Sequence, residues 1–105
     1  MQSDLRGRVS LVTGAARGIG QSIGDLLARN GSRVVYTDVD GDGAKGAASA
    51  FPGSLAMTLD VTSPTQIEAV IDQVIREAGR LDILVNNAGI NSVVHRVTID
   101  EYPRE

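Results

Sequence analysis

Short apolar segments alternate with helical hydrophobic patterns along this chain of 105 residues. Four of the segments are rich in β-branched residues and almost wholly apolar, which is typical of strands buried on both faces of a parallel sheet. They are Val9–Thr13, Arg33–Asp38, Leu55–Asp60 and Leu81–Asn86. Because each connection between them has room for a helix, the order predicts an α/β fold with a doubly wound parallel sheet and right-handed crossovers.

The three connecting segments carry helical patterns of unequal strength. The first is amphipathic and ends at Asn30-Gly31, and the apolar residues that it is predicted to bury are Ile19, Ile23, Leu26 and Leu27. The second, around residues 44–51, is diluted by glycine and is the weakest. The third begins with the capping signal Ser63-Pro64-Thr65-Gln66 and carries an apolar stripe from Ile67 to Ala78.

The composition excludes several classes of function. A net charge of −3 and an aromatic content of 3%, with no tryptophan, argue against a nucleic-acid-binding protein, which would usually show a basic stripe with aromatic residues. No apolar run reaches the roughly 18 residues that a membrane span needs. The absence of cysteine excludes disulfides, thiolate metal sites and a cysteine nucleophile, and the expected location is the reducing cytoplasm.

The turn after the first predicted strand is the most informative loop. It reads Thr13-Gly14-Ala15-Ala16-Arg17-Gly18-Ile19-Gly20, a G-x-x-x-G-x-G pattern that opens a helix. Gly14 allows a sharp turn, while Gly18 and Gly20 lack side chains where a pyrophosphate would approach the N–H groups of the helix N-terminus. One turn later, Gly24 is expected to let the helix lie close to the sheet. A glycine-rich turn without a ligand is the alternative interpretation.

The stretch "DVDGDGAKG" from Asp38 to Gly46 fits two further motifs, and both fail. A calcium loop needs glutamate at its twelfth position, where this chain has Ser49, and a helix where this chain has a strand. The G-x-G-x-x-G match at Gly41–Gly46 has no strand-end carboxylate about 20 residues later. We therefore expect no metal site and a polar turn at 40–43. Asp38, at the end of the second strand, is predicted to accept hydrogen bonds from the ribose hydroxyls of a dinucleotide.

Four motifs in register resemble the N-terminal half of the short-chain dehydrogenases/reductases. They are "TGAARGIG" at 13–20, the strand-end Asp38, "DV" at Asp60-Val61 and "NNAG" at Asn86–Gly89. The resemblance runs from Arg8 to about Tyr102, which is less than half of a typical family domain. It implies that residues 1–105 are the dinucleotide-binding part of an incomplete Rossmann domain, cut after the fourth strand. It also implies an oxidoreductase acting on an alcohol or carbonyl substrate, and a homo-oligomer.

The resemblance also implies a set of residues that bind the cofactor. Those on the pyrophosphate side would be Gly14, Gly18, Ile19 and Gly20; those beside the adenine would be Asp60 and Val61; and those beside a ribose would be Asn87, Ala88 and Gly89. Asn86 and Asn87 have a structural alternative, because strand-end asparagines often bond to neighbouring backbone. NAD is predicted as the cofactor, because the Asp38 carboxylate repels a 2′-phosphate. NADP is the less favoured alternative, since Arg17 could hold the extra phosphate.

The family's catalytic groups are not found in this sequence. They are a serine and a Tyr-x-x-x-Lys pair, but the only lysine is Lys45, and neither Tyr36 nor Tyr102 has a lysine four positions later. We therefore predict no catalytic residue and no activity for this chain alone. The sole histidine, His95, is expected in a surface loop over residues 87–97. The fourth strand is expected to have an unpaired edge, so a non-catalytic dinucleotide-binding or interaction module is the alternative function.

Overall fold

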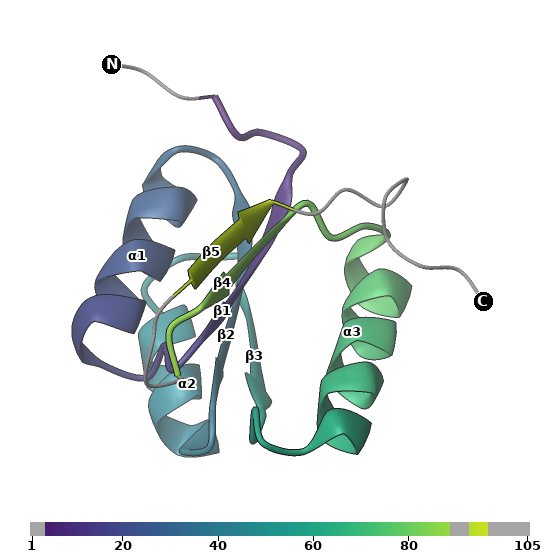
Figure 1. Cartoon of the computed structure of the whole chain (residues 1–105). Coiled ribbons are helices and arrows are strands. Elements are labelled where there is room, and N and C mark those ends of the chain that lie inside the picture. Colours follow the sequence, from purple (N-terminus) through teal and green to yellow (C-terminus); the bar gives the residue numbers. More distant parts are fainter. Residues whose placement is uncertain (1–3, 89–92, 97–105) are drawn as a thin grey trace.

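The computed structural model describes residues 4–88 and 93–96 and shows one sheet flanked by helices (Figure 1). In chain order the elements are β1 (Val9–Thr13), α1 (Gly18–Arg29), β2 (Arg33–Asp38), α2 (Gly41–Ala48), β3 (Leu55–Thr58), α3 (Pro64–Ala78), β4 (Ile83–Asn86) and β5 (Val93–Arg96). The strand order across the sheet is β3-β2-β1-β4-β5.

The first four strands are parallel, as the sequence predicts. β1 lies in the centre between β2 and β4, with Val12 opposite Tyr36 and Thr13 opposite Asn86. β3 pairs with the other side of β2, with Asp38 opposite Thr58. The carboxyl ends of β1, β2 and β4 therefore meet at one edge of the sheet, which is where ligands bind in open sheets of this kind.

The fifth strand contradicts two expectations from the sequence. Residues 93–96 lie within the predicted loop, but they pair antiparallel with β4, with Val93 opposite Asn86 and Arg96 opposite Ile83. The sheet thus continues beyond the fourth strand, and the outer edge of β4 is not open. An unpaired strand edge leaves a row of N–H and C=O groups without hydrogen-bond partners. The β-branched residues Val93 and Val94 favour a strand, and an antiparallel strand can pair with those groups of β4. His95 accordingly lies on a strand, opposite Leu84.

Helices cover both faces of the sheet, so the core has two halves. α1 and α2 lie on one face and α3 lies on the other (Figure 1). On the α3 face the buried cluster comprises Val9, Leu11, Val35, Leu59, Val70, Ile71, Val74 and Leu81. On the opposite face it comprises Val12, Ala15, Val34, Tyr36, Ala44, Ala47, Ala48 and Val85. Inward-facing residues of each strand alternate between the two clusters, which explains why the strands are apolar throughout.

α1 lies close to the sheet at two glycines, and Ile23 and Leu27 beside them are partly buried and pack against the core as predicted. Gly20 and Gly24 are buried, while the side chains of Ile19 and Leu26 are 72% and 56% exposed. A Cβ atom at Gly24 would lie 2.6 Å from Cε2 of Tyr36, which confirms that this glycine permits a close approach. The prediction that Ile19 and Leu26 are buried is wrong, because the close approach through glycine turns these side chains away from the sheet.

α3 follows its sequence signals closely. The Ser63 hydroxyl accepts a hydrogen bond from the Gln66 N–H at 3.2 Å, and Gly79 ends the helix with φ of 84°. The Gln66 side chain departs from the usual capping box, because its Oε1 accepts from the N–H of Asp60 at 2.9 Å. This bond ties the start of α3 to the end of β3.

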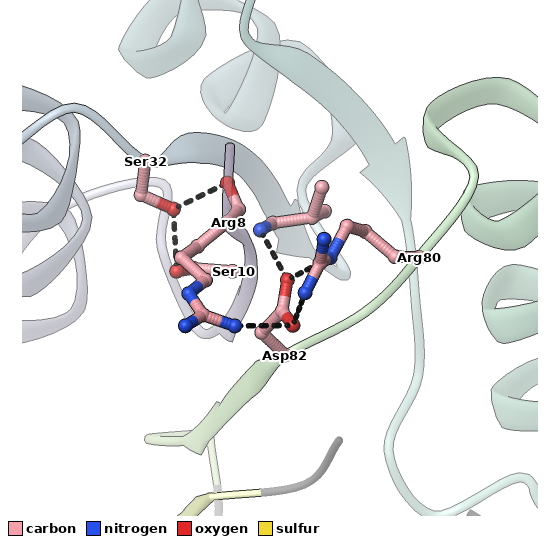
Figure 2. Close-up of polar contacts among 6 residues, drawn as sticks. Arg8, Ser10, Ser32, Arg80 and Asp82 are labelled. Carbon is pink, nitrogen blue, oxygen red and sulfur yellow. Dashed lines mark hydrogen bonds and ion pairs between the residues drawn. The ribbon is translucent and has the colours of Figure 1, made fainter. Parts of the chain in front are cut away.

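A buried carboxylate joins β1 to the chain before β4, at the amino ends of the strands (Figure 2). Asp82 accepts hydrogen bonds from the Val9 N–H at 2.9 Å and from Nε and Nη2 of Arg80 at 2.8 and 2.7 Å. Arg8 forms an ion pair with it at 3.5 Å. Burial of this carboxylate opposes its ionisation, but the bonds from Arg80 and Val9 outweigh that effect and the pKa of Asp82 is lowered.

Neither a membrane span nor a metal cluster is found in residues 4–88 and 93–96. No helix there combines the length and the apolar character needed to cross a bilayer. Within the same residues, no three His, Cys, Asp or Glu side chains are grouped so that they could hold a metal ion.

Candidate dinucleotide-binding site

Three loops meet at the carboxyl ends of β1, β2 and β4, and they bring together most of the residues predicted to bind the cofactor. The loop after β1 is held to β2 by the bond from Ala15 N–H to the Thr37 carbonyl, at 2.9 Å. The chain after β3 is held to β2 by the bond from Leu59 N–H to the Asp38 carbonyl, at 3.0 Å. The loop after β4 is held to β1 by Thr13, as described below.

The glycines of the first loop have two different roles. Gly14 and Gly18 have φ of 63° and 66°, in the left-handed region that favours glycine. A Cβ atom at Gly18 would have nothing within 4 Å, so this position faces open space. A Cβ atom at Gly20, in contrast, would collide with the Gly14 carbonyl and would lie 2.6 Å from Nδ2 of Asn87. Gly18 therefore leaves room for a ligand, while Gly20 allows the loops to pack together.

α1 begins without a side-chain cap. Arg17 occupies the N-cap position and makes no capping bond, whereas Asp40 caps α2 and Ser63 caps α3. The N–H groups of the first turn have no intrahelical acceptor in any α-helix, so an uncapped start leaves them for a ligand or water. They also carry the positive end of the helix dipole. Together with the open space at Gly18, this start suits an anion such as pyrophosphate.

Asp38 connects the first loop to the second. Its Oδ2 accepts from the Ala16 N–H and its Oδ1 from the Asp40 N–H, both at 3.0 Å. The side chain is half-buried at the end of β2 and is directed at the glycine loop. A carboxylate oxygen can accept more than one hydrogen bond, so both oxygens can still accept from ribose hydroxyls.

The segment after Asp38 is helical, which corrects the expected polar turn. Asp40 caps α2 by accepting from the Gly43 N–H at 3.0 Å, and Gly41–Ala48 is an α-helix. The whole G-x-G-x-x-G match therefore lies inside a helix instead of in a loop between a strand and a helix. Gly43 is needed there for packing, since a Cβ atom would lie 2.6 Å from Oδ2 of Asp40 and 2.8 Å from Cβ of Ala16.

An ion pair crosses between the first two loops. Nη2 of Arg17 donates to Oδ2 of Asp40, and the two side chains are 68% and 40% exposed. The bond from the Gly43 N–H, followed by the bond from Arg17, holds the pKa of Asp40 below its ordinary value. Arg17 is thus directed at Asp40, next to Asp38.

Thr13 organises the third loop. Its hydroxyl donates to Oδ1 of Asn86 at 2.9 Å and accepts from the N–H groups of Asn87 at 2.9 Å and Ala88 at 3.1 Å. Nδ2 of Asn87 donates to the Gly14 carbonyl at 3.3 Å. The side chain of Asn87 thus bonds to backbone, as in its structural alternative, whereas that of Asn86 bonds to the side chain of Thr13. The role of Thr13 was not predicted, although the parallel register of β1 and β4 places it opposite Asn86.

Replacing Thr13 with valine should loosen this third loop. The variant keeps the shape of the side chain but loses one donor and two acceptor contacts, and we expect a loss of about 1–2 kcal/mol in the free energy of unfolding. Urea denaturation measures this loss. Thr37→Val is a matched control, because Thr37 is also buried but makes a single bond, to the Val12 carbonyl at 2.9 Å. Equal losses in the two variants would contradict the organising role of Thr13.

The residues expected beside the adenine lie after β3. Oδ1 of Asp60 accepts from the N–H of Thr62 at 2.9 Å and from its hydroxyl at 2.6 Å. The hydroxyl bond, followed by the backbone bond, lowers the pKa of Asp60. Val61 is half-buried and lines a cavity of about 90 Å³ on the α3 face, where Thr13 and Asn86 are also lining residues. Gly89 lies outside the described residues, as does the helix start expected at residue 98.

Comparison with known proteins supports the family resemblance. The family model for short chain dehydrogenases matches residues 8–104. A 3-oxoacyl-[acyl-carrier-protein] reductase of Vibrio cholerae is 49% identical over 88 residues, which are 83% of this chain and 36% of that enzyme. The chain thus spans little more than a third of that relative's length.

Two solved structures share the fold. A structure described as ribose-5-phosphate isomerase from Brucella melitensis matches with a TM-score of 0.77 and 34% identity, over 86% of this chain and 35% of that one. The structure of a hydroxysteroid dehydrogenase from Escherichia coli matches with a TM-score of 0.75 and 37% identity, over 82% of this chain and 38% of that one. The similarity therefore covers most of this chain and about a third of each structure.

Proposed function

The chain belongs to the short-chain dehydrogenase family, and from this membership we propose that it forms the cofactor-binding part of an oxidoreductase. The reaction would move hydride between a nicotinamide dinucleotide and an alcohol or carbonyl substrate. One observation carries the proposal. The uncapped start of α1, with open space at Gly18, lies beside a strand-end carboxylate, Asp38, that is bonded to the same loop.

Each part of this arrangement suits a part of the dinucleotide. The first-turn N–H groups of α1, at Gly18, Ile19 and Gly20, would bind the pyrophosphate, because they are donors at the positive end of a helix dipole. Asp38 would accept hydrogen bonds from the adenosine ribose. The exposed side chain of Ile19 would cover an apolar part of the cofactor when it is bound.

The remaining residues of the site would hold the other ribose and the adenine. Asp60 and Val61, after β3, are proposed to flank the adenine. Asn87, Ala88 and Gly89 are proposed to lie beside the nicotinamide ribose, and the bond from Asn87 to the Gly14 carbonyl supports this by joining their loop to the glycine loop.

We propose NAD as the cofactor rather than NADP. A carboxylate at Asp38 bonds well to ribose hydroxyls and repels a 2′-phosphate. Arg17, the cation that would favour NADP, is directed at Asp40 in an ion pair. Both observations support a site for an unphosphorylated ribose.

The bound dinucleotide would accept hydride from an alcohol or, in its reduced form, supply it to a carbonyl, and the residues of this chain would bind and orient the dinucleotide. Asp38 would hold the adenosine and the α1 N–H groups would hold the pyrophosphate of the bound cofactor. That this chain alone lacks catalytic residues stays a prediction from the sequence, as do a cytoplasmic location and a homo-oligomer. The matched proteins are named for different compounds, so the substrate class proposed is no finer than an alcohol or its carbonyl.

Titration of the chain with NAD tests the proposal. We expect saturable binding with a dissociation constant below about 1 mM, measured by calorimetry, and a rise in the melting temperature with NAD concentration. Asp38→Asn should weaken NAD binding about tenfold, because a charge-assisted acceptor for the ribose hydroxyls is lost. Asp42→Asn is the matched control, since Asp42 is an exposed acid in the first turn of α2 that should not contact the ribose. A folded chain that does not bind NAD would refute the proposal.

A further inference from the structure

The second loop contains an acid that no cofactor contact requires. Asp40 makes three contacts: its N–H donates to Asp38, its Oδ1 caps α2 at Gly43, and its Oδ2 accepts from Arg17. The first bond places Asp40 directly beside the carboxylate proposed to bind the ribose. Any substituent on that ribose would therefore meet Asp38, Asp40 and Arg17 together.

We propose that Asp40 determines the choice between NAD and NADP by holding Arg17 in an ion pair beside Asp38. This inference rests on the proposed function and goes beyond it by naming the residue that discriminates. Asp40 acts through Arg17 and is therefore a positioning residue.

The charges around the ribose explain the discrimination. A 2′-phosphate carries a charge of about −1.5 to −2 at neutral pH. Asp38, Asp40 and Arg17 together carry −1, so the site repels that phosphate even though it contains a guanidinium. Without the carboxylate of Asp40 the three positions carry no net charge, and Arg17 can turn to the phosphate and form charge-assisted bonds. Specificity here would come from a repulsive group as much as from an attractive one.

Asp40 is held in place more firmly than Arg17. Its backbone is bonded to Asp38 and its side chain to the Gly43 N–H, both at 3.0 Å, and Gly43 provides space that any larger residue would fill. Within the described residues the Arg17 side chain pairs with Asp40 and is 68% exposed. Removing the charge of Asp40 should therefore release Arg17 and leave the loop unchanged.

Asp40→Asn tests the inference, because asparagine caps a helix as well as aspartate does. The probes are 2′,5′-ADP and 5′-AMP, which differ only in the 2′-phosphate, together with NADP and NAD. We expect the variant to bind 2′,5′-ADP and NADP about tenfold more tightly, while 5′-AMP and NAD change less than about twofold. The gain in affinity for 2′,5′-ADP should shrink as salt is raised from 50 to 500 mM. Salt screens exposed charges, with a Debye length of about 8 Å at physiological ionic strength.

The double variant Arg17→Gln/Asp40→Asn separates the two residues. The double variant should bind 2′,5′-ADP and NADP no more tightly than wild type does, because no cation is then left to bind the 2′-phosphate. Asp40→Ser, which also caps but carries no charge, should reproduce the gain and guards against a folding defect of the asparagine variant. Three results would overturn the inference. They are a wild-type chain that already prefers 2′,5′-ADP to 5′-AMP, Asp40 variants that gain equal affinity for both probes, and a double variant that keeps the gain. A wild-type chain that binds NAD but whose probe ratio is unchanged in both Asp40 variants would refute this inference alone, whereas failure to bind NAD at all would refute the proposed function.

Discussion

Gly20→Ala should destabilise the fold by about 3 kcal/mol, the upper part of the range for overpacking, and should abolish NAD binding. The added Cβ would collide with the Gly14 carbonyl and approach Nδ2 of Asn87 to 2.6 Å. The first of these atoms belongs to the backbone of a turn with positive φ, so it cannot move aside without displacing α1 from β1. Because domains of this size are stable by only about 5–15 kcal/mol, the loss is a large fraction of the total.

Urea denaturation measures the destabilisation, and Gly46→Ala provides the matched control. Gly46 lies in α2 without positive φ, and a Cβ atom there would have nothing within 4 Å. Alanine at this position should stabilise the chain by about 0.5–1 kcal/mol, because it favours the helix and restricts the unfolded chain. If Gly20→Ala and Gly46→Ala had the same effect, close packing at Gly20 would not be the reason for the glycine.

The second large effect is expected at the other end of the sheet, at Asp82. Asp82→Ala should cost about 2–3 kcal/mol at pH 7, because it leaves the buried Val9 N–H without its acceptor and removes the partner of Arg80 and Arg8 (Figure 2). The side chain of Asp82 is 5% exposed, so water replaces these contacts poorly. The arginines are half exposed, which keeps the loss below that of a fully buried pair.

The contribution of Asp82 should depend on pH in a defined direction. Its pKa is lower in the folded chain than the unfolded value of about 3.9, so the folded state favours the ionised carboxylate. The stabilisation is complete above the unfolded pKa and is lost as the pH falls through the folded one. Urea unfolding at pH 7, 5 and 3 should show the difference between wild type and Asp82→Ala shrinking only in the most acidic sample. Asp4→Asn is the control for an exposed pair and should have no measurable effect at any of these pH values.

Most of the fold could be predicted from local patterns. The four parallel strands and the cap of α3 at Ser63 follow from apolar runs and capping signals, each of which depends on residues close in the chain. β5 could not, because pairing of residues 93–96 with β4 depends on an edge that only the assembled sheet presents. The exposure of Ile19 and Leu26 was also missed, since hydrophobic periodicity does not show that Gly20 and Gly24 are the fully buried residues of α1.

The loops that carry the predicted site residues meet at one edge of the sheet, but the contacts between them were not predicted. The glycine loop and Asp38 occupy the expected edge of the sheet because that edge is fixed by the parallel topology. The roles of Thr13 and Asp40 depend on side-chain contacts with residues distant in sequence, which motif spacing does not contain. Motif reasoning explained the missing side chain of Gly20 by the approach of a pyrophosphate. Close packing is a second reason, because a Cβ atom at Gly20 would collide with the Gly14 carbonyl and with Asn87.

The bonds of Thr13 to the loop after β4 have a consequence for how the site forms. They join residues that are 73 to 75 positions apart in the chain. Closing such a long loop costs conformational entropy, and this cost grows only slowly with loop length. The cost falls in the folding step, when β1 and β4 pair. A ligand that bound beside these loops would meet contacts already made during folding, so a larger share of its contact energy would appear as affinity.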